Sequence, residues 1–236
     1  MQPVRAVLFD LHDTLVAVPG DNLAARRRAA HDVLVAETGA ADFAAFCAAD
    51  DEARASLYTT GNPAMLDYGV AHRFRVATRR LLGRDLSPEA LARMVEAYID
   101  VWIALLAPLP GTVDALDRLG KRYRLGLVTD FGDAPGIYRI LDRFGLAGRF
   151  DPVVISAEVG RVKPHPAMFA RALKGLAMLP TDVVHVGDNL VCDVEGAARA
   201  GIRPILMDYA ARHLDYPGER IGDLRELEGL LERGGT

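Results

Sequence analysis

The chain has 236 residues, of which 50% are apolar and 25% are charged, and its net charge is −4. This balance is typical of a globular protein with a buried core, and the length favours one core domain with a modest insertion. The small negative charge argues against a nucleic-acid-binding protein, which usually has a basic face, and no stretch is long and apolar enough to span a bilayer.

The chain opens on an apolar run of β-type residues, 4–9, that stops at Asp10, and this pattern predicts a buried strand. Four more short apolar runs follow later, each succeeded by polar or glycine-containing sequence: 124–128, 152–155, 183–186 and 204–207. Strands of a parallel sheet have this character because helices cover both of its faces. His185 lies inside one of these runs and is interpreted as a packed core histidine.

Between these runs, apolar residues recur at the three-to-four spacing of helices that bury one face. The predicted helices are 112–119, 136–144, 167–173, 193–200 and 224–231. The fourth of them stops at Gly201, a residue type that favours helix C-termini. Because strand and helix alternate, the sequence predicts an α/β fold with a parallel sheet.

The stretch from 16 to 108 interrupts this alternation. It is rich in Ala, Leu and Arg, and Ser87-Pro88-Glu89 combines an N-cap, a first-turn proline and a first-turn acid. Breaks near Gly39, Gly61-Asn62-Pro63 and Gly83 suggest about four helices. The predicted domains are a core, 1–15 and 109–236, and an all-helical domain, 16–108, inserted after the first strand.

Three local features of the sequence indicate which residues are exposed and where in the cell the protein is located. The basic triplet Arg26-Arg27-Arg28 is interpreted as the solvated face of a helix. Cys47 and Cys192 are far apart and neither lies in a CxxC spacing, so we expect reduced thiols. The N-terminal sequence has no basic segment followed by a long apolar run, so we expect no signal peptide and a cytoplasmic protein.

Polar side chains follow the predicted strands, at the edge of a parallel sheet where ligands bind. Asp10 comes directly after the first strand, and Thr129-Asp130 follows the second. Lys163 comes a little after the third strand. Asp188 follows the fourth strand, and Asp193 lies five residues further along the chain. The predicted topology therefore brings carboxylates, a hydroxyl and an ammonium to one edge of the sheet.

This set of groups fits phosphoryl transfer better than other reactions. A carboxylate serves as a covalent nucleophile, and several carboxylates repel one another unless a hard cation such as Mg²⁺ binds their oxygens. A hydroxyl and an ammonium hold the equatorial oxygens of a transferring phosphoryl group, and Mg²⁺ neutralises its charge. The sequence thus predicts a Mg²⁺-dependent hydrolase in which Asp10 attacks phosphorus.

Four motifs, in this order, give the chain a resemblance to the haloacid dehalogenase-like (HAD) superfamily of hydrolases, in the subgroup with a helical cap inserted after the first strand. They are FDLHDTL at 9–15, Val128-Thr129, VGRVKPHP at 159–166 and GDNLVCD at 187–193. The stretch PLPGTVDALDRL at 108–119 also resembles the family's return from cap to core. The match covers nearly the whole chain and implies a Rossmann-like parallel sheet with a mobile, all-helical cap.

The resemblance also implies a role for each residue of the predicted site. Asp10 is implied as the nucleophile that becomes aspartyl-phosphate, with Lys163 steadying it. The implied catalytic residues are Asp10, His12, Thr129 and Lys163, and the implied substrate-binding residues are Thr129, Asp130 and Lys163. The implied Mg²⁺ ligands are Asp10, His12 through its backbone carbonyl, Asp188 and Asp193.

Two positions depart from the family pattern. Most phosphatases of the family carry Asp two residues after the nucleophile as the general acid/base, and here that residue is His12. Histidine titrates near neutrality, at an unperturbed pKa of about 6.5, but a nearby Mg²⁺ disfavours its protonated form. The role of the His12 side chain therefore stays open, while a backbone contact to the metal is unaffected. Asp130 stands where relatives often have Asn, and the sequence offers no account of its added charge.

The leading hypothesis is a phosphatase of a small phosphorylated metabolite, whose cap chooses the substrate. Two alternatives are a 2-haloacid dehalogenase, in which Asp10 attacks carbon and displaces halide, and a non-catalytic protein that binds a phosphorylated ligand. The acids Asp188 and Asp193 argue against the first, and the retained nucleophile, Thr129 and Lys163 against the second. We expect no nucleic-acid or membrane partner and a monomer or homodimer. The sequence does not identify the substrate.

Overall fold

The computed structural model describes residues 3–20, 22–59 and 62–233, and the chain divides into two compact units. The sheet unit combines residues 1–18 with 107–236, and the helical unit spans 19–106. All the predicted strands lie in the sheet unit, and nearly all of the stretch rich in Ala, Leu and Arg lies in the helical unit.

The sheet unit is built on a parallel sheet, as the sequence predicts, and this sheet has six strands. Across the sheet the strands are β5 (Val153–Ile155), β4 (Arg124–Thr129), β1 (Ala6–Phe9), β6 (Val183–Gly187), β7 (Arg203–Met207) and β8 (Arg220–Ile221). The first five match the predicted strands to within two residues, and β8 is a short additional edge strand. Central β1 pairs with β4 and β6 in a register that aligns Phe9 with Leu127 and Val186. Residues that follow these three strands therefore meet at one edge.

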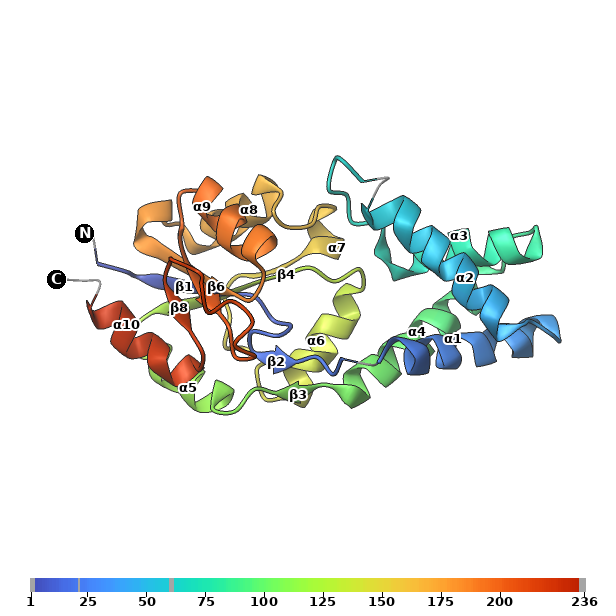
Figure 1. The fold of residues 1–236 in the computed structure, drawn as a ribbon, viewed down its shortest axis with the longest axis horizontal. Helices are drawn as coiled ribbons and strands as arrows, with labels where there is room; N and C mark the ends of the chain where they lie inside the picture. The colour runs from blue at the N-terminus through green and yellow to red at the C-terminus, as the bar shows by residue number, and fades with distance from the viewer. Residues whose placement is uncertain (1–2, 21, 60–61, 234–236) are drawn as a thin grey trace. The chain divides into compact units, whose positions relative to one another are not determined.

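Helices connect the strands, and Figure 1 shows α7, α8 and α9 on one side of the sheet with α5, α6 and α10 on the other. Their bounds are α5 (Thr112–Leu119), α6 (Ala134–Arg143), α7 (Ser156–Val159), α8 (Pro166–Leu176), α9 (Gly196–Arg199) and α10 (Leu227–Arg233). Short 3₁₀ turns form at Pro180–Asp182 and Leu224–Glu226. The helix predicted over 193–200 is α-helical only in α9, because a π-helical turn, Leu190–Glu195, precedes it. Asn189 opens that turn by accepting the backbone N–H groups of Val191 and Cys192.

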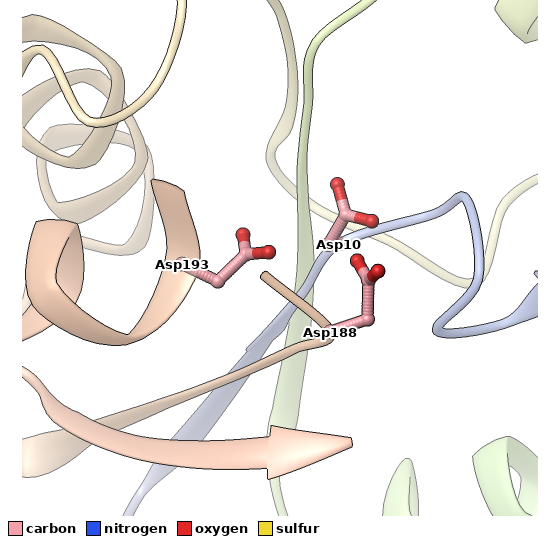
Figure 2. Close-up of side chains that lie close together, drawn as sticks. All are labelled: Asp10, Asp188 and Asp193. Carbon is pink, nitrogen blue, oxygen red and sulfur yellow. The ribbon is translucent and has the colours of Figure 1, made fainter. Parts of the chain in front are cut away.

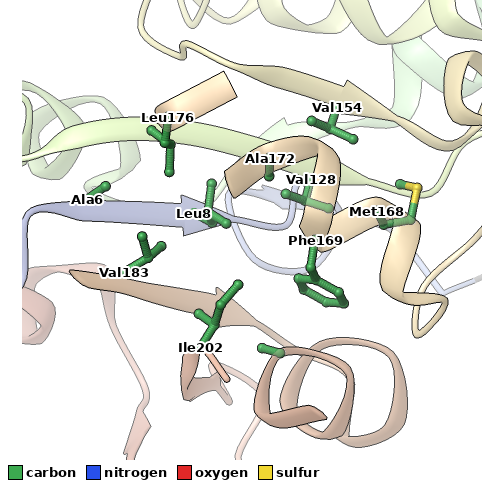
Figure 3. Packing of buried hydrophobic residues seen from close by; sticks show 11 residues of the cluster. Ala6, Leu8, Val128, Val154, Met168, Phe169, Ala172, Leu176, Val183 and Ile202 are labelled. Carbon is green, nitrogen blue, oxygen red and sulfur yellow. The ribbon is translucent and has the colours of Figure 1, made fainter. Parts of the chain in front are cut away.

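Apolar side chains from the sheet and from α8 form one buried cluster, which Figure 3 shows. Leu8 of β1 and Val128 of β4 share it with Phe169 and Ala172 of α8, and all four are fully buried. Burial of a side chain such as Phe169 stabilises the fold by about 1.5–3 kcal/mol. This packing fixes the strands whose ends carry the predicted site.

The helical unit contains four α-helices within the described residues, as the sequence predicts. They are α1 (Leu23–Thr38), α2 (Phe43–Arg54), α3 (Gly69–Leu82) and α4 (Pro88–Leu105), with a π-helical turn, Ala55–Thr59, after α2. Gly39 and Gly83 end α1 and α3 in the left-handed conformation, and Ser87 caps α4 by accepting the Ala90 N–H at 3.1 Å. The predicted break at Gly61 lies outside the described residues. Throughout the part of the chain that is described, none of the helices has the length and apolar character needed to cross a membrane.

The basic triplet of α1 is not a solvated face, so that prediction is wrong for two of its three residues. Arg28 is exposed, but Arg26 and Arg27 are 8% and 6% exposed. The Arg26 guanidinium lies over the Tyr98 ring at 4.0 Å and the Trp102 ring at 3.7 Å. The prediction failed because the partners of these side chains come from other helices of the unit, which the local charge pattern does not reveal.

A two-stranded antiparallel ribbon ties the two points at which the chain leaves and returns to the sheet unit. The ribbon pairs β2 (Val16–Ala17) with β3 (Ala107–Pro108). Next to it, the Leu15 carbonyl accepts the Leu109 N–H at 2.9 Å and the Thr112 hydroxyl at 3.0 Å. The sequence analysis did not predict this ribbon, because strands of two residues have no detectable periodicity.

Candidate active site

Three of the predicted acidic residues meet at the carboxyl edge of the sheet. Asp10 directly follows β1, Asp188 follows β6, and Asp193 lies in the π-helical turn after β6. One carboxylate oxygen from each residue lies within 4.8 Å of the other two. Figure 2 shows the three carboxylates converging from these separate elements. The register of β1 with β6 brings them together, since their positions in the sequence are far apart.

Lys163 joins this group from the loop between α7 and α8. Its ammonium nitrogen Nζ lies 2.6 Å from Asp10 Oδ1 and 2.6 Å from Asp193 Oδ1, and the side chain is 3% exposed. An ammonium held between two buried carboxylates makes strong charge-assisted hydrogen bonds. Lys163 is therefore oriented toward the nucleophile that the sequence predicts.

Asp130, which the sequence left unexplained, holds the loop that carries Lys163. The backbone N–H of Lys163 donates to Asp130 Oδ1 at 3.0 Å and Oδ2 at 3.1 Å. A carboxylate can accept both contacts at once, which gives Asp130 a physical role in positioning Lys163. The contact with substrate that the sequence analysis gives for Asp130 stays a prediction.

The electrostatics of the site are dominated by burial and by the mutual repulsion of the carboxylates. Burial raises the pKa of Asp10 to about 8, because the contact with Lys163 offsets only part of the desolvation and Asp193 adds repulsion. Burial and the neighbouring charges of Asp193 and Asp13 raise the pKa of Asp188 to about 6. Burial acts to raise the pKa of Asp193 as well, but Lys163 and a hydrogen bond from His185 outweigh it and hold that pKa low.

The donor set fits a divalent cation. Three carboxylates face one ammonium, so the fully ionised cluster carries an excess of negative charge. A hard cation with oxygen ligands would relieve the repulsion that raises the pKa values of Asp10 and Asp188. The structure thus contains a buried acidic cluster suited to a metal ion of that class.

Thr129 and His12 complete the predicted set at the same edge. Thr129 is the last residue of β4, next to β1, and its hydroxyl Oγ1 is buried without a hydrogen-bond partner among the described residues. A buried hydroxyl without a partner is costly, and a phosphoryl oxygen would supply one. The His12 ring packs against Phe131, with ring centroids 5.4 Å apart and planes inclined by 37°.

The sequence analysis gave no functional role to several residues that lie at this edge. His185 contacts Asp193, and Phe131 contacts His12, although neither belongs to a motif. The Tyr209 hydroxyl donates to Asp13 Oδ1 at 3.0 Å, and both residues border a cavity of about 310 Å³ whose lining includes Asp188. The one available signal was His185 itself, a polar residue at a buried position of a predicted central strand.

The chain is similar to known proteins along nearly its whole length. The sequence profile described as haloacid dehalogenase-like hydrolase matches residues 4–201. The glyceraldehyde 3-phosphate phosphatase of Methanopyrus kandleri is 36% identical over 245 residues, covering 95% of this chain and 98% of that protein. A solved HAD phosphatase from Thermococcus onnurineus is 26% identical, with a TM-score of 0.67 and coverage of 97% and 98% of the two chains. A solved 2-haloacid dehalogenase from Pseudomonas syringae pv. Tomato has a TM-score of 0.74 at 24% identity, with coverage of 98% and 99%, and shares the fold.

Proposed function

Because the chain belongs to the haloacid dehalogenase-like hydrolases, we propose that it is a Mg²⁺-dependent phosphatase that cleaves a small phosphorylated metabolite through an aspartyl-phosphate on Asp10. The observation that carries this proposal is the contact of the Lys163 ammonium with Asp10 and Asp193 beside a third carboxylate. The relative that shares 36% identity over nearly the full length is named for a three-carbon phosphate ester. A substrate of that class is the first to test.

The proposed reaction has two displacements at phosphorus. The Asp10 carboxylate forms a bond to phosphorus while the bond to the ester oxygen breaks, and the alcohol leaves with a proton. Water then attacks phosphorus, loses a proton, and releases inorganic phosphate and the free carboxylate. The Lys163 ammonium and the Thr129 hydroxyl donate to the phosphoryl oxygens in both steps.

A bound metal fits this scheme through residues that the chain already provides. Asp10, Asp188 and Asp193 would hold Mg²⁺ together with the backbone carbonyl of His12. Such an ion supplies positive charge that favours the ionised form of Asp10 and offsets the charge of the phosphoryl group. Asp10 is thereby available as a carboxylate nucleophile at neutral pH, despite the burial that raises its pKa.

Removal of the metal gives the first prediction. Excess EDTA should reduce phosphate release from glyceraldehyde 3-phosphate to background, and added Mg²⁺ should restore it, because the carboxylate cluster then repels the anionic substrate. Asp188→Asn should raise the Mg²⁺ concentration that gives the half-maximal rate, as measured by a phosphate-release assay.

The same treatment with chelator separates the phosphatase from the competing dehalogenase. A 2-haloacid dehalogenase would release halide from 2-chloropropionate, and halide release that persists in EDTA would favour that activity over the phosphatase. Phosphate release that is unaffected by the chelator would contradict the metal-dependent scheme directly.

His12 is proposed as the residue that transfers the proton, in place of the family's aspartate. His12→Ala should lower turnover of an alkyl phosphate by about 10²- to 10⁴-fold, because an alkoxide leaving group must be protonated. The same variant should affect p-nitrophenyl phosphate much less, since p-nitrophenolate leaves without a proton. Steady-state rates on the two substrates measure the difference.

His12→Asp is the matched control for this prediction. It restores the family's usual residue and should keep most of the activity on the alkyl ester. Equal losses on both substrates in His12→Ala would instead assign His12 to substrate or metal positioning, and unchanged rates would remove its side chain from the mechanism.

The helical unit is proposed as a cap that selects the substrate. The ribbon of β2 and β3 places both connections to this unit side by side at the sheet unit, an arrangement suited to an inserted domain. A phosphate-release screen over sugar phosphates, nucleotides, phosphoglycolate-like acids and phosphonates tests which substrate is selected.

Both cysteines of the chain are free thiols, which supports the proposed cytoplasmic location.

A further inference from the structure

His185 connects the core of the sheet to the proposed metal site. It lies in the middle of β6 and is fully buried, with its ring edge-on to Phe169 at a centroid distance of 5.3 Å. The sequence predicts a packed core histidine, and the ring does pack there. Its Nε2, however, lies 2.9 Å from Asp193 Oδ1, so the ring also makes one polar contact with the site.

The surroundings of the ring determine which nitrogen carries the proton. Its Nε2 faces Asp193 Oδ1, and the same oxygen accepts the Lys163 ammonium at 2.6 Å. A carboxylate oxygen that is paired with an ammonium accepts hydrogen bonds, so the hydrogen between Nε2 and Asp193 belongs to the ring. The other nitrogen, Nδ1, is buried and has no hydrogen-bond partner among the described residues. An apolar side chain would avoid that cost, so the single hydrogen bond to Asp193 is the interaction that a histidine adds here.

The orientation of the Asp193 carboxylate depends on three donors from separate parts of the chain. Oδ1 accepts His185 Nε2 and, at 2.6 Å, Lys163 Nζ, while Oδ2 accepts the Asn189 backbone N–H at 3.1 Å. Gly187 leaves the room that this carboxylate occupies, because a Cβ at that position would lie 2.3 Å from Asp193 Cγ. Lys163 also donates to Asp10 Oδ1 at 2.6 Å. A change in the orientation of Asp193 would therefore also affect the position of Asp10.

On the basis of the proposed function, we propose that His185 is a positioning residue: by donating Nε2–H to Asp193, it holds that carboxylate in the orientation that binds Lys163 and the metal ion. Such second contacts behind a metal ligand change affinity without touching the metal. Among the described residues, Asp193 is the one hydrogen-bond partner of the His185 ring, whose edge-on neighbour is Phe169.

Two variants of nearly equal shape isolate the donor. His185→Gln keeps an N–H group at a reach similar to Nε2, and His185→Met fills similar space without a donor. Isothermal titration of Mg²⁺ into the metal-free protein should show about 10- to 100-fold weaker binding for the Met variant, and near wild-type binding for the Gln variant. Both variants should stay folded by circular dichroism, because the substitutions preserve buried volume.

The outcomes separate this inference from the proposed function, because the titration needs no turnover. Wild-type binding of Mg²⁺ together with equal binding by both variants would overturn the role of His185 and leave the phosphatase proposal intact. Absence of Mg²⁺ binding by the wild type would overturn both. Nitrogen-15 NMR of the wild-type ring is a second, variant-free test, which also decides the matter if the Met variant does not fold. A proton on Nε2 is expected, and a ring protonated at Nδ1 alone would overturn the proposal.

Discussion

Asp10→Asn should lower the turnover of any phosphate ester by on the order of 10⁴-fold or more, because the amide cannot form the covalent intermediate. The substitution is nearly isosteric and keeps the Oδ1 acceptor that contacts Lys163 Nζ at 2.6 Å. Burial and repulsion from Asp193 raise the pKa of Asp10, so the ionised carboxylate is disfavoured in the metal-free protein and a neutral amide in its place should not destabilise the fold. The loss of turnover would therefore come from the missing nucleophile and not from unfolding.

Asp13→Asn is the matched control for this loss. Asp13 is a carboxylate of the same loop, where it accepts the Tyr209 hydroxyl and the Val18 N–H, both at 3.0 Å. It has no place in the proposed mechanism, and its replacement should change turnover less than about tenfold. Mass spectrometry of acid-quenched reactions should detect a phosphoryl adduct on the wild type and none on Asp10→Asn. Substantial turnover by Asp10→Asn would assign the nucleophile to another residue.

Asp50→Ala should destabilise the helical unit by about 3–5 kcal/mol, the cost of leaving buried charges without their partner. Asp50 is fully buried in α2, and its two oxygens pair with Arg27 Nε at 2.8 Å and Arg73 Nε at 2.9 Å. Without this carboxylate, the buried Arg73 of α3 would lose its ion pair with α2, and the buried Arg27 of α1 would keep its pair with Asp51 but lose the one with Asp50. The ion pairs thus link three helices of the unit.

Urea unfolding followed by tryptophan fluorescence measures this effect, since Trp102 is the only tryptophan of the chain and lies in α4 of the helical unit. Asp51→Ala is the matched control, because Asp51 also pairs with Arg27 but its side chain is 64% exposed. Exposed ion pairs contribute about 0–1 kcal/mol, so the control should shift the midpoint little. Equal shifts for the two variants would contradict the assigned role of Asp50.

The sequence predicted the elements of the sheet unit well because their signals are local. A buried parallel strand appears in the sequence as a short apolar run. The carboxyl ends of parallel strands lie at the same edge of a sheet, so positions 10, 129 and 188 could be assigned to one edge from the sequence alone. The same reasoning missed the π-helical turn that carries Asp193 and the ribbon of β2 and β3. Both are too short for periodicity to detect.

The local charge pattern was a poor guide to burial in the helical unit. Three consecutive arginines predicted a solvated face, yet Arg26 stacks on two rings of α4 and Arg27 pairs with Asp50 of α2. A buried arginine is stabilised by partners from distant segments, and a single sequence does not show which segments these are. Asp130 is a similar case, since it accepts the backbone N–H of Lys163 from another loop.

By itself, the sequence determined the α/β class, the helical insertion and the kinds of group that follow each strand, because composition and spacing act over a few neighbouring residues. Only the tertiary structure decided that Lys163 bridges Asp10 and Asp193, that Asp130 holds the Lys163 loop, and that His185 reaches the site from within β6. Each of these depends on distances between residues 30 or more positions apart, or on the direction in which a buried side chain points. Those quantities arise from packing, which no local pattern encodes.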